Sequence, residues 1–179
     1  EKQWGLEFEL AWHSDLIDFE FSHTYTHLYH FDLKKGVPFS YVTTKPNGYG
    51  DNLNSWSNHL SKFNARYQLN DKWLIHGAVV YYWGFDGIKD SLEYLTDIRT
   101  ANGDAPLYEF GHDEISGSNV YLNLGVNYNM QENLNLGFNG YNLLGLIDMK
   151  YNKRNYFQSS DGSYRLQAVS LSLYANLLF

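Results

Sequence analysis

The stretch Gln3-Trp-Gly-Leu-Glu-Phe-Glu-Leu-Ala-Trp-His13 alternates between two kinds of side chain. Its even-numbered positions are large and apolar, and its odd-numbered positions are polar or small. Successive side chains of a β-strand point to opposite faces, so this stretch has one apolar and one polar face. A helical template with apolar residues at i, i+3 and i+4 would mix the two kinds. The stretch therefore predicts a strand.

The same alternation recurs along the chain. Short polar turns at Ser14-Asp15, Asn70 to Lys72 and Gln131 to Asn133 join the alternating stretches into three hairpins, and a last stretch ends the chain. Beyond the first strand, we expect strands at about 17–31, 62–69, 73–85, 119–130, 134–139 and 164–179. The sequence thus predicts an all-β fold with seven antiparallel strands.

Composition excludes several classes of function. The chain has no Cys, so neither a disulfide framework nor a thiolate metal site is available. Its net charge of −7 is spread along the chain, and no basic stripe exists to neutralise phosphates, so nucleic acid is not an expected partner. No run of about 18 apolar residues predicts a transmembrane helix. We expect no cofactor.

Two environments suit such strands: a soluble sandwich with an apolar interior, or a membrane barrel with an apolar exterior. The strands have about 10 residues, close to the 9 to 11 that a bilayer crossing requires and longer than the globular mode of about 5 to 6. The short turns also alternate with long connections at Leu33 to Ser57, Gly87 to Ser118 and about Ile147 to Ser163. This asymmetry is typical of outer-membrane barrels.

Large aromatic residues mark both ends of the apolar stripes. Near the short turns these are Trp12, Tyr67, Trp73 and Tyr128, and near the long connections they are Tyr29, Phe31, Trp83 and Phe85. Such residues form two interfacial girdles in membrane barrels, whereas packing in a soluble core is the alternative. We therefore predict transmembrane strands in the outer membrane of a Gram-negative bacterium, in contact with outer-membrane lipid and lipopolysaccharide.

An odd number of strands does not suit an ordinary bacterial barrel, whose strand number is even. An open sheet in lipid would leave backbone groups at both edges without hydrogen bonds, at several kcal/mol each. We therefore expect residues 1–179 to form a single domain that is the C-terminal segment of a larger barrel. The remaining strands would come from the rest of the polypeptide or from a partner barrel chain.

Two stretches near the end resemble the TonB-dependent outer-membrane receptors. They are Gly140-Tyr-Asn-Leu-Leu-Gly-Leu-Ile-Asp-Met-Lys-Tyr151 and the final strand from Tyr164. In the family, an Asn-Leu-aromatic-Asp turn precedes a basic residue and the last strand; here Asn142 and Leu143 match that turn and Arg165 the basic residue. The match departs from the pattern at Leu144 and Gly145, where Phe-Asp is usual.

The end of the chain also resembles the C-terminal signal by which bacterial outer-membrane barrels are recognised during assembly. Apolar residues alternate up to a terminal aromatic residue in both. The residues that would carry the signal are Leu173, Tyr174, Leu177 and Phe179.

The receptor resemblance implies energy-coupled uptake of a bulky, scarce ligand such as a siderophore, haem, metal, cobalamin or oligosaccharide. Uptake would pass through a plugged barrel of about 22 strands, with a TonB-like energy-coupling protein acting through a plug absent from this chain. The protein would not be an enzyme. The alternatives are a porin-like or structural barrel component that pairs with another chain, and an outer-membrane hydrolase using Ser22, Ser57 or Ser61 with His59 or His76.

Candidate ligand contacts lie where the strands meet the long connections. His30, Asp32, Tyr82 and Asp86 are expected on the polar face near this rim, and the connections supply the others. The full set is His30, Asp32, Trp56, Tyr82, Asp86, Arg99, Tyr108, Arg154 and Tyr156. Lower on the polar face we expect an internal charge network that faces a plug or water, formed by Glu7, Glu9, Asp18, Glu20, Lys62, Arg66 and His76.

Two stretches were considered for metal binding. His23 and His27 share one strand face, but positions i and i+4 lie about 13 Å apart, too far for one ion held at about 2 Å by each ligand. We expect these histidines in the outer-leaflet girdle, meeting lipid phosphates. A loop can bring oxygen and nitrogen ligands together, so the weak metal candidates are Glu109, His112, Asp113 and Glu114.

Overall fold

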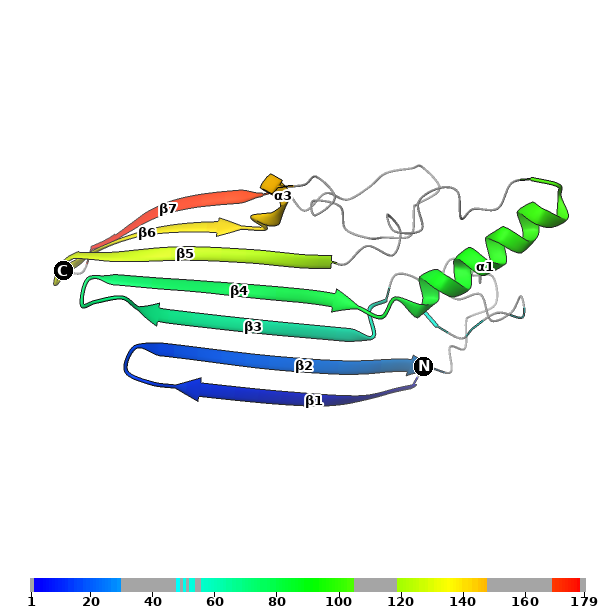
Figure 1. Cartoon of the computed structure of the whole chain (residues 1–179), viewed down its shortest axis with the longest axis horizontal. Helices are drawn as coiled ribbons and strands as arrows, with labels where there is room; N and C mark the ends of the chain where they lie inside the picture. Colours follow the sequence, from blue (N-terminus) through cyan, green and yellow to red (C-terminus); the bar gives the residue numbers. More distant parts are fainter. Residues whose placement is uncertain are drawn as a thin grey trace.

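Seven strands form one antiparallel sheet in the computed structural model of the chain (Figure 1). The structure describes residues 2–29, 48, 50, 52–53, 56–104, 119–147 and 169–177. Each strand pairs with its neighbours in sequence, which confirms the predicted all-β antiparallel class. The strands are β1 Lys2–His13, β2 Ile17–Tyr29, β3 His59–Gln68, β4 Trp73–Trp83, β5 Asn119–Gln131, β6 Leu134–Tyr141 and β7 Ser170–Leu177.

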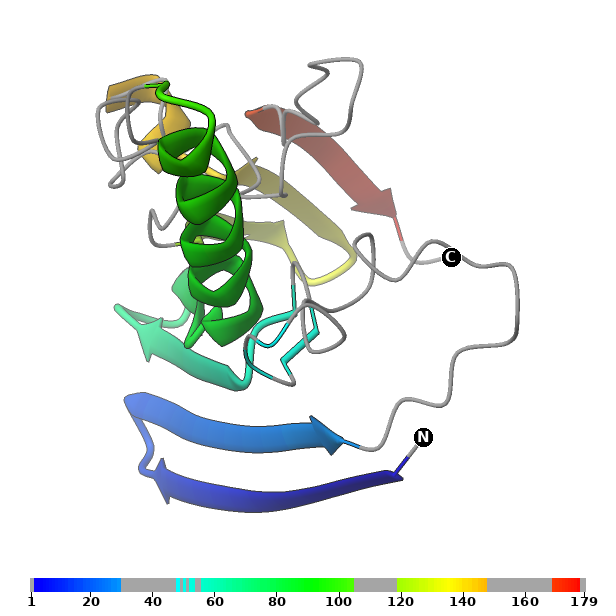
Figure 2. The same ribbon diagram turned by 90° about the vertical axis from the view of Figure 1, so that its right-hand side faces the viewer.

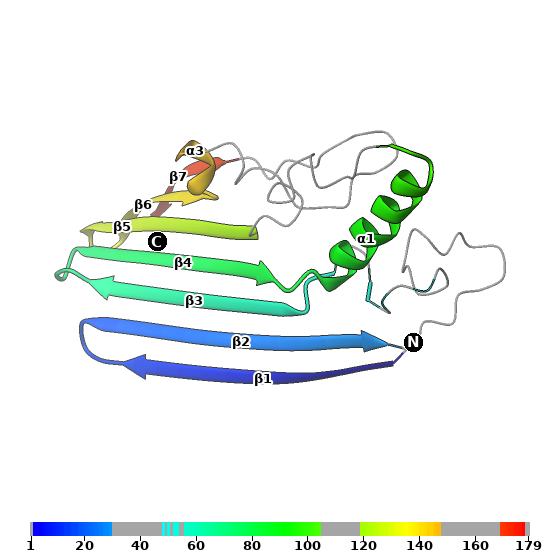
Figure 3. The same cartoon turned by 45° about the vertical axis from the view of Figure 1, so that its right-hand side comes forward.

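The three short turns lie together at one end of the sheet (Figure 3). In the β1–β2 turn, the backbone N–H of Ser14 donates to Ile17 O at 2.9 Å. In the β3–β4 turn, Asn70 Oδ1 accepts from the backbone N–H groups of Lys72 and Trp73, both at 3.0 Å. We call this the turn end of the sheet. The opposite end, where β2 and β4 finish, is called the rim.

The connection after β4 differs from the expected long loop, because it contains helix α1, Asp86–Ala101. The strand ends at Trp83, two residues earlier than expected, and Gly84 follows with φ of +72°. Glycine adopts this left-handed conformation at little cost, and it turns the chain out of the sheet. Phe85 is therefore not part of the strand stripe, and strand parity does not place Asp86. A second, short helix α3, Leu144–Ile147, follows β6.

Strand register joins the separate apolar stripes into one apolar face. Phe21, Phe63, Val79 and Leu122, for example, are successive partners across four strands. This face is exposed: the exposed fraction is 48% for Trp4, 56% for Phe8, 45% for Leu124 and 82% for Leu173.

The described residues contain no apolar core beneath that face. Their two buried large apolar side chains are Leu28 and Tyr121, and strand parity places both on the opposite, polar face. In a soluble sandwich the apolar faces would converge on a shared interior. Among the described strands, no second sheet packs against the apolar face.

The sheet curves but does not close (Figure 2). Among the described strands, β1 and β7 each pair on one side only, so both outer edges carry unpaired backbone groups. The described helices include none long and apolar enough to cross a membrane.

Candidate functional site

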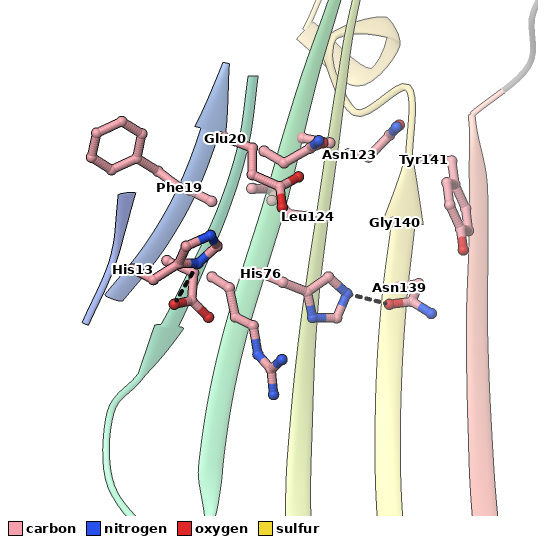
Figure 4. A pocket seen from close by; sticks show the side chains of 15 residues that line it. His13, Phe19, Glu20, His76, Asn123, Leu124, Asn139, Gly140 and Tyr141 are labelled. Carbon is pink, nitrogen blue, oxygen red and sulfur yellow. Dashed lines mark hydrogen bonds and ion pairs between the residues drawn. The ribbon is translucent and has the colours of Figure 1, made fainter. Parts of the chain in front are cut away.

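A hollow of about 610 Å³ lies on the polar face and is lined from six strands, β1 to β6 (Figure 4). Its walls bring together side chains that are far apart in sequence. The polar residues that line it are His13, Asp18, Glu20, Asn64, Arg66, His76, Asn123, Asn139 and Tyr141. Because so many strands contribute, this hollow follows the inner curve of the sheet.

Charge on the polar face is confined to the first three strands. The acidic residues Glu7, Glu9, Asp18 and Glu20 lie on β1 and β2, and the basic residues Lys62 and Arg66 lie on β3. The described parts of β4 to β7 carry no Asp, Glu, Lys or Arg on this face, and β5 to β7 are rich in Asn instead. The hollow therefore has an acidic side, a basic strip and an amide side, which together suit a polar ligand.

The residues of the expected internal charge network lie on the predicted polar face. His13 Nδ1 and Asp18 Oδ1 lie 3.3 Å apart, an ion pair when His13 is protonated, and both side chains are well exposed, at 63% and 39%. Register places Arg66 between Asp18 and His76, but no ion pair joins Arg66 to Asp18 within the described strands. Contact of these charges with a plug or water stays a prediction.

Two hydrogen bonds cross over a glycine on the polar face. His76 Nε2 lies 3.1 Å from Asn139 Oδ1, reaching over β5 at Gly125, where a Cβ would lie 2.2 Å from that nitrogen. Tyr174 donates its hydroxyl to Asn127 Oδ1 over Gly137 of β6, where a Cβ would lie 2.1 Å from the Tyr174 ring. The glycines therefore make room for links between strands that are not neighbours.

The rim gathers some of the predicted ligand residues. Tyr82 lies on the polar face with its ring against buried Tyr121, at 6.1 Å between centroids. Asp86 accepts a hydrogen bond from Asn58 Nδ2 at 3.0 Å, so the segment before β3 is tied to the start of α1. Trp56 is in the same segment and is exposed.

Arg99 lies away from Tyr82 and Asp86, because it is in the last turn of α1. Along the helix it is about 20 Å from Asp86, at about 1.5 Å per residue. The remaining predicted residues lie outside the described part of the chain: His30, Asp32, Tyr108, Arg154, Tyr156, Glu109, His112, Asp113, Glu114 and Phe179. Within the described ranges, no three metal-ligating side chains are grouped.

The predicted assembly-signal residues divide between the two faces. Leu173 and Leu177 lie on the apolar face and are exposed. Tyr174 lies on the polar face, where it bonds to Asn127.

A cluster on the apolar face was not foreseen in full. At the rim, His23, Tyr25, His59, Ser61 and Trp83 meet across β2, β3 and β4, and we call them the rim cluster. Register explains the meeting, because His23 pairs with Ser61, Tyr25 with His59, and His59 with Trp83. Strand parity placed His23 on this face, but the register that brings His59 beside it depends on the long connection after β2.

The rim cluster also bears on the hydrolase alternative. Ser61 Oγ lies 2.9 Å from His23 Nδ1, and His23 Nε2 lies 3.3 Å from His59 Nδ1. A nucleophile within hydrogen-bond reach of a base is the first requirement of such a site. Ser57 instead donates to backbone carbonyls, at 2.6 and 2.7 Å, and the orienting position behind His23 holds a histidine rather than a carboxylate.

Comparisons with known proteins give no relative for this chain. No protein-family model matches it. No curated protein and no solved structure matches it either.

Proposed function

We propose that the chain forms the C-terminal strands of a larger outer-membrane β-barrel, with its apolar face toward lipid and its polar face lining the lumen. One observation carries the proposal: a single apolar face extends over seven strands and is exposed. Water would make such a surface costly at about 25 cal/mol per Å², whereas acyl chains would not. The open edges of β1 and β7 would pair with further strands, from the same polypeptide or from a partner chain.

The dimensions agree with this orientation. Trp73 and Trp83 begin and end β4 on the apolar face and are ten residue steps apart. At about 3.4 Å per residue and a tilt of about 40°, they differ in height by about 26 Å, against an apolar band of about 25 Å. Trp73 packs against Tyr128 at 4.5 Å between ring centroids. These residues would form parts of the two interfacial girdles.

Within this barrel, we infer energy-coupled uptake of a bulky, scarce ligand, as in the TonB-dependent receptors. Support comes from the resemblance around Asn142 and from the hollow polar face, which offers acidic, basic and amide groups to a ligand. A siderophore, haem, metal, cobalamin or oligosaccharide would enter at the rim, past Trp56, Tyr82 and Asp86. A plug and a TonB-like energy-coupling protein would complete the machinery, and the protein would have no catalytic role or cofactor.

Accessibility of single cysteines tests the orientation cleanly, because the chain has none of its own. Leu124 and Asn123 are neighbours on opposite faces of β5. In whole cells, a membrane-impermeant maleimide should label Asn123→Cys through the lumen and leave Leu124→Cys unlabelled. Strong labelling of Leu124→Cys would refute the membrane orientation.

Uptake is tested separately, with the full-length polypeptide in Gram-negative cells. Cells with and without its gene are compared for accumulation of radiolabelled ferric siderophores, haem and cobalamin, before and after a protonophore. Accumulation that needs both the gene and the proton gradient supports the receptor. Uptake that persists after the gradient collapses indicates the porin-like alternative.

A second candidate function, lipid-ester hydrolysis, is favoured by the 2.9 Å contact of Ser61 with His23. A fluorophosphonate probe should label an activated Ser61 and should fail to label Ser61→Ala. Under the transport proposal, neither protein is labelled.

A further inference from the structure

The apolar face carries its ionic side chains on β1 to β3. In the described strands, its Lys, His, Arg, Asp and Glu residues are Lys2, His23, His27 and His59. All four are basic. Lys2, His27 and His59 lie toward the rim, and His23 lies midway along β2, beside His59. No acidic residue shares the face within those strands. A surface with four basic groups and no acidic group is complementary to an anion.

Packing holds the two central histidines in fixed positions. The His59 ring stacks on Trp83, with centroids 3.8 Å apart and an interplanar angle of 8°. His23 Nε2 is 3.3 Å from His59 Nδ1, and its Nδ1 is 2.9 Å from Ser61 Oγ. The Trp83 indole N–H also donates to Ser61 Oγ, at 3.2 Å. These contacts engage both ring nitrogens of His23, Nδ1 of His59 and the Ser61 hydroxyl, which leaves Nε2 of His59 as the imidazole nitrogen that can meet a ligand beside the Trp83 ring.

The other two basic groups extend the same surface across β1 and β2. Lys2 pairs with Tyr29 and Trp4 with His27 in the strand register. The His27 and Tyr29 rings stack at 5.9 Å between centroids, and Trp4 packs edge-on against Tyr25 at 5.2 Å. Aromatic rings with polar edges are the side chains that settle at the boundary between acyl chains and headgroups.

We propose that the rim cluster binds the phosphate of an anionic lipid headgroup in the outer leaflet. His27 lies about 13 Å from His23 along β2, and Lys2, opposite Tyr29, lies about 20 Å from it, so these two groups would meet neighbouring headgroups. This inference rests on the proposed membrane orientation and identifies the partner of that face. Phosphate oxygens accept charge-assisted hydrogen bonds from ammonium and imidazolium groups. The site lies at the height where the girdle meets the headgroups, so a lipid supplies the phosphate and its acyl chains cover the apolar face below.

Protonation should strengthen the binding. Two neutral imidazoles carry one N–H each, and one of these can make the hydrogen bond between the rings, so one further proton gives the pair a positive charge. The titratable groups around His59 are His23 and Tyr25 from β2, and Asp86 from α1. Asp86 is the acidic group that interacts electrostatically with His59. Binding should therefore tighten as pH falls through the range in which histidines take up a proton.

Lipid binding by the full-length polypeptide provides the test. The protein is purified in neutral detergent, and bound phosphatidylglycerol or phosphatidylcholine is counted by native mass spectrometry at about pH 5.5 and 7.5. The wild type should prefer phosphatidylglycerol by about tenfold, and His23→Gln with His59→Gln should remove most of that preference. The matched control is His13→Gln at the turn end, which should leave the preference unchanged.

A second variant keeps the test informative if the glutamine substitutions fail to fold. His59→Arg holds a fixed positive charge, so it should raise phosphatidylglycerol binding at about pH 7.5 and flatten the pH dependence. Inorganic phosphate should not displace the lipid; displacement would indicate a free-phosphate site instead.

Equal retention of the two lipids by the wild type, or an equal loss in His13→Gln, would overturn the lipid-site proposal. That failure is distinct from failure of the membrane orientation, which the labelling of Leu124→Cys and Asn123→Cys reports. A protein with correct labelling and no lipid preference retains the barrel and loses only this site.

Discussion

The two faces of this sheet are built from the same strands and are stabilised by different interactions. On the apolar face, rings pack against rings, as Phe19 does against Trp12 and Phe63 at centroid distances of 5.6 and 6.2 Å. On the polar face, hydrogen bonds such as that of His76 with Asn139 reach across strands. The larger apolar residues are the exposed ones, which inverts the usual burial rule. A one-residue change in position therefore moves a side chain from the apolar face to the polar face.

The largest expected effect comes from placing a charge on the apolar face. Leu124 lies midway along β5, opposite Gly77 and Gly140. Arginine there would meet the bilayer midplane, and we expect Leu124→Arg to lower the free energy of unfolding by about 2 to 4 kcal/mol. The measurement is equilibrium unfolding in lipid vesicles with a chemical denaturant.

The matched control is the same substitution one residue earlier. Asn123 points to the polar face, where water or a ligand can solvate a guanidinium, so Asn123→Arg should cost less than about 1 kcal/mol. If both variants lose the same stability, the two faces are not in different solvents and the comparison fails.

A smaller effect is expected when a glycine that lies under a neighbouring side chain of the polar face is replaced by alanine. A Cβ at Gly137 would lie 2.1 Å from the Tyr174 ring, so Gly137→Ala must displace that ring and break its hydrogen bond to Asn127. We expect a loss of about 1 to 3 kcal/mol by the same unfolding measurement.

The control for this prediction removes the displaced ring. In a Tyr174→Ala background nothing remains to be displaced, so Gly137→Ala should cost little, and the two substitutions should be strongly non-additive. Additive losses would show that the glycine is needed for backbone reasons unrelated to Tyr174.

At the rim, the His59 and Trp83 rings stack on the apolar face, with the shortest centroid distance of the ring pairs among the described residues. Trp83→Leu keeps an apolar side chain at the girdle and removes the stack on His59. The expected loss in the free energy of unfolding is about 0.5 to 1.5 kcal/mol, the usual value of an aromatic pair. Trp83→Phe retains a ring and should lose less; an equal loss in both would mean that the stack itself contributes nothing.

Much of this fold could be predicted from the sequence because alternation is a local signal. The strand stripes, such as that of Gln3 to His13, and the short polar turns correctly predicted seven antiparallel strands and which residues share a face. Helix α1 was not predicted, because the polar and aromatic residues after Gly84 are also typical of a long loop. Ile88, Leu92, Leu95 and Ile98 nevertheless recur at helical spacing within Asp86–Ala101.

The candidate sites were harder to predict, since they depend on register between strands separated by long connections. No local pattern reveals that His59 stands beside His23, because the connection between β2 and β3 sets their relative height. The hollow on the polar face has the same origin, as it draws on six strands. Pairing within the expected charge network also depends on side-chain placement, because opposite charges on register partners, such as Asp18 and Arg66, need not touch.

The smallest effect should follow from the exposed ion pair of the polar face. His13 and Asp18 lie 3.3 Å apart with well-exposed side chains, so water and salt screen the pair. Asp18→Asn should change the free energy of unfolding by less than about 1 kcal/mol at low salt and by nothing measurable in about 1 M salt. Glu20→Gln, on the same strand and without an ion-pair partner among the described residues, sets the baseline. A loss for Asp18→Asn that persists at high salt would mean that this face is held together by charge, and that its open acidic and basic groups are structural rather than available to a ligand.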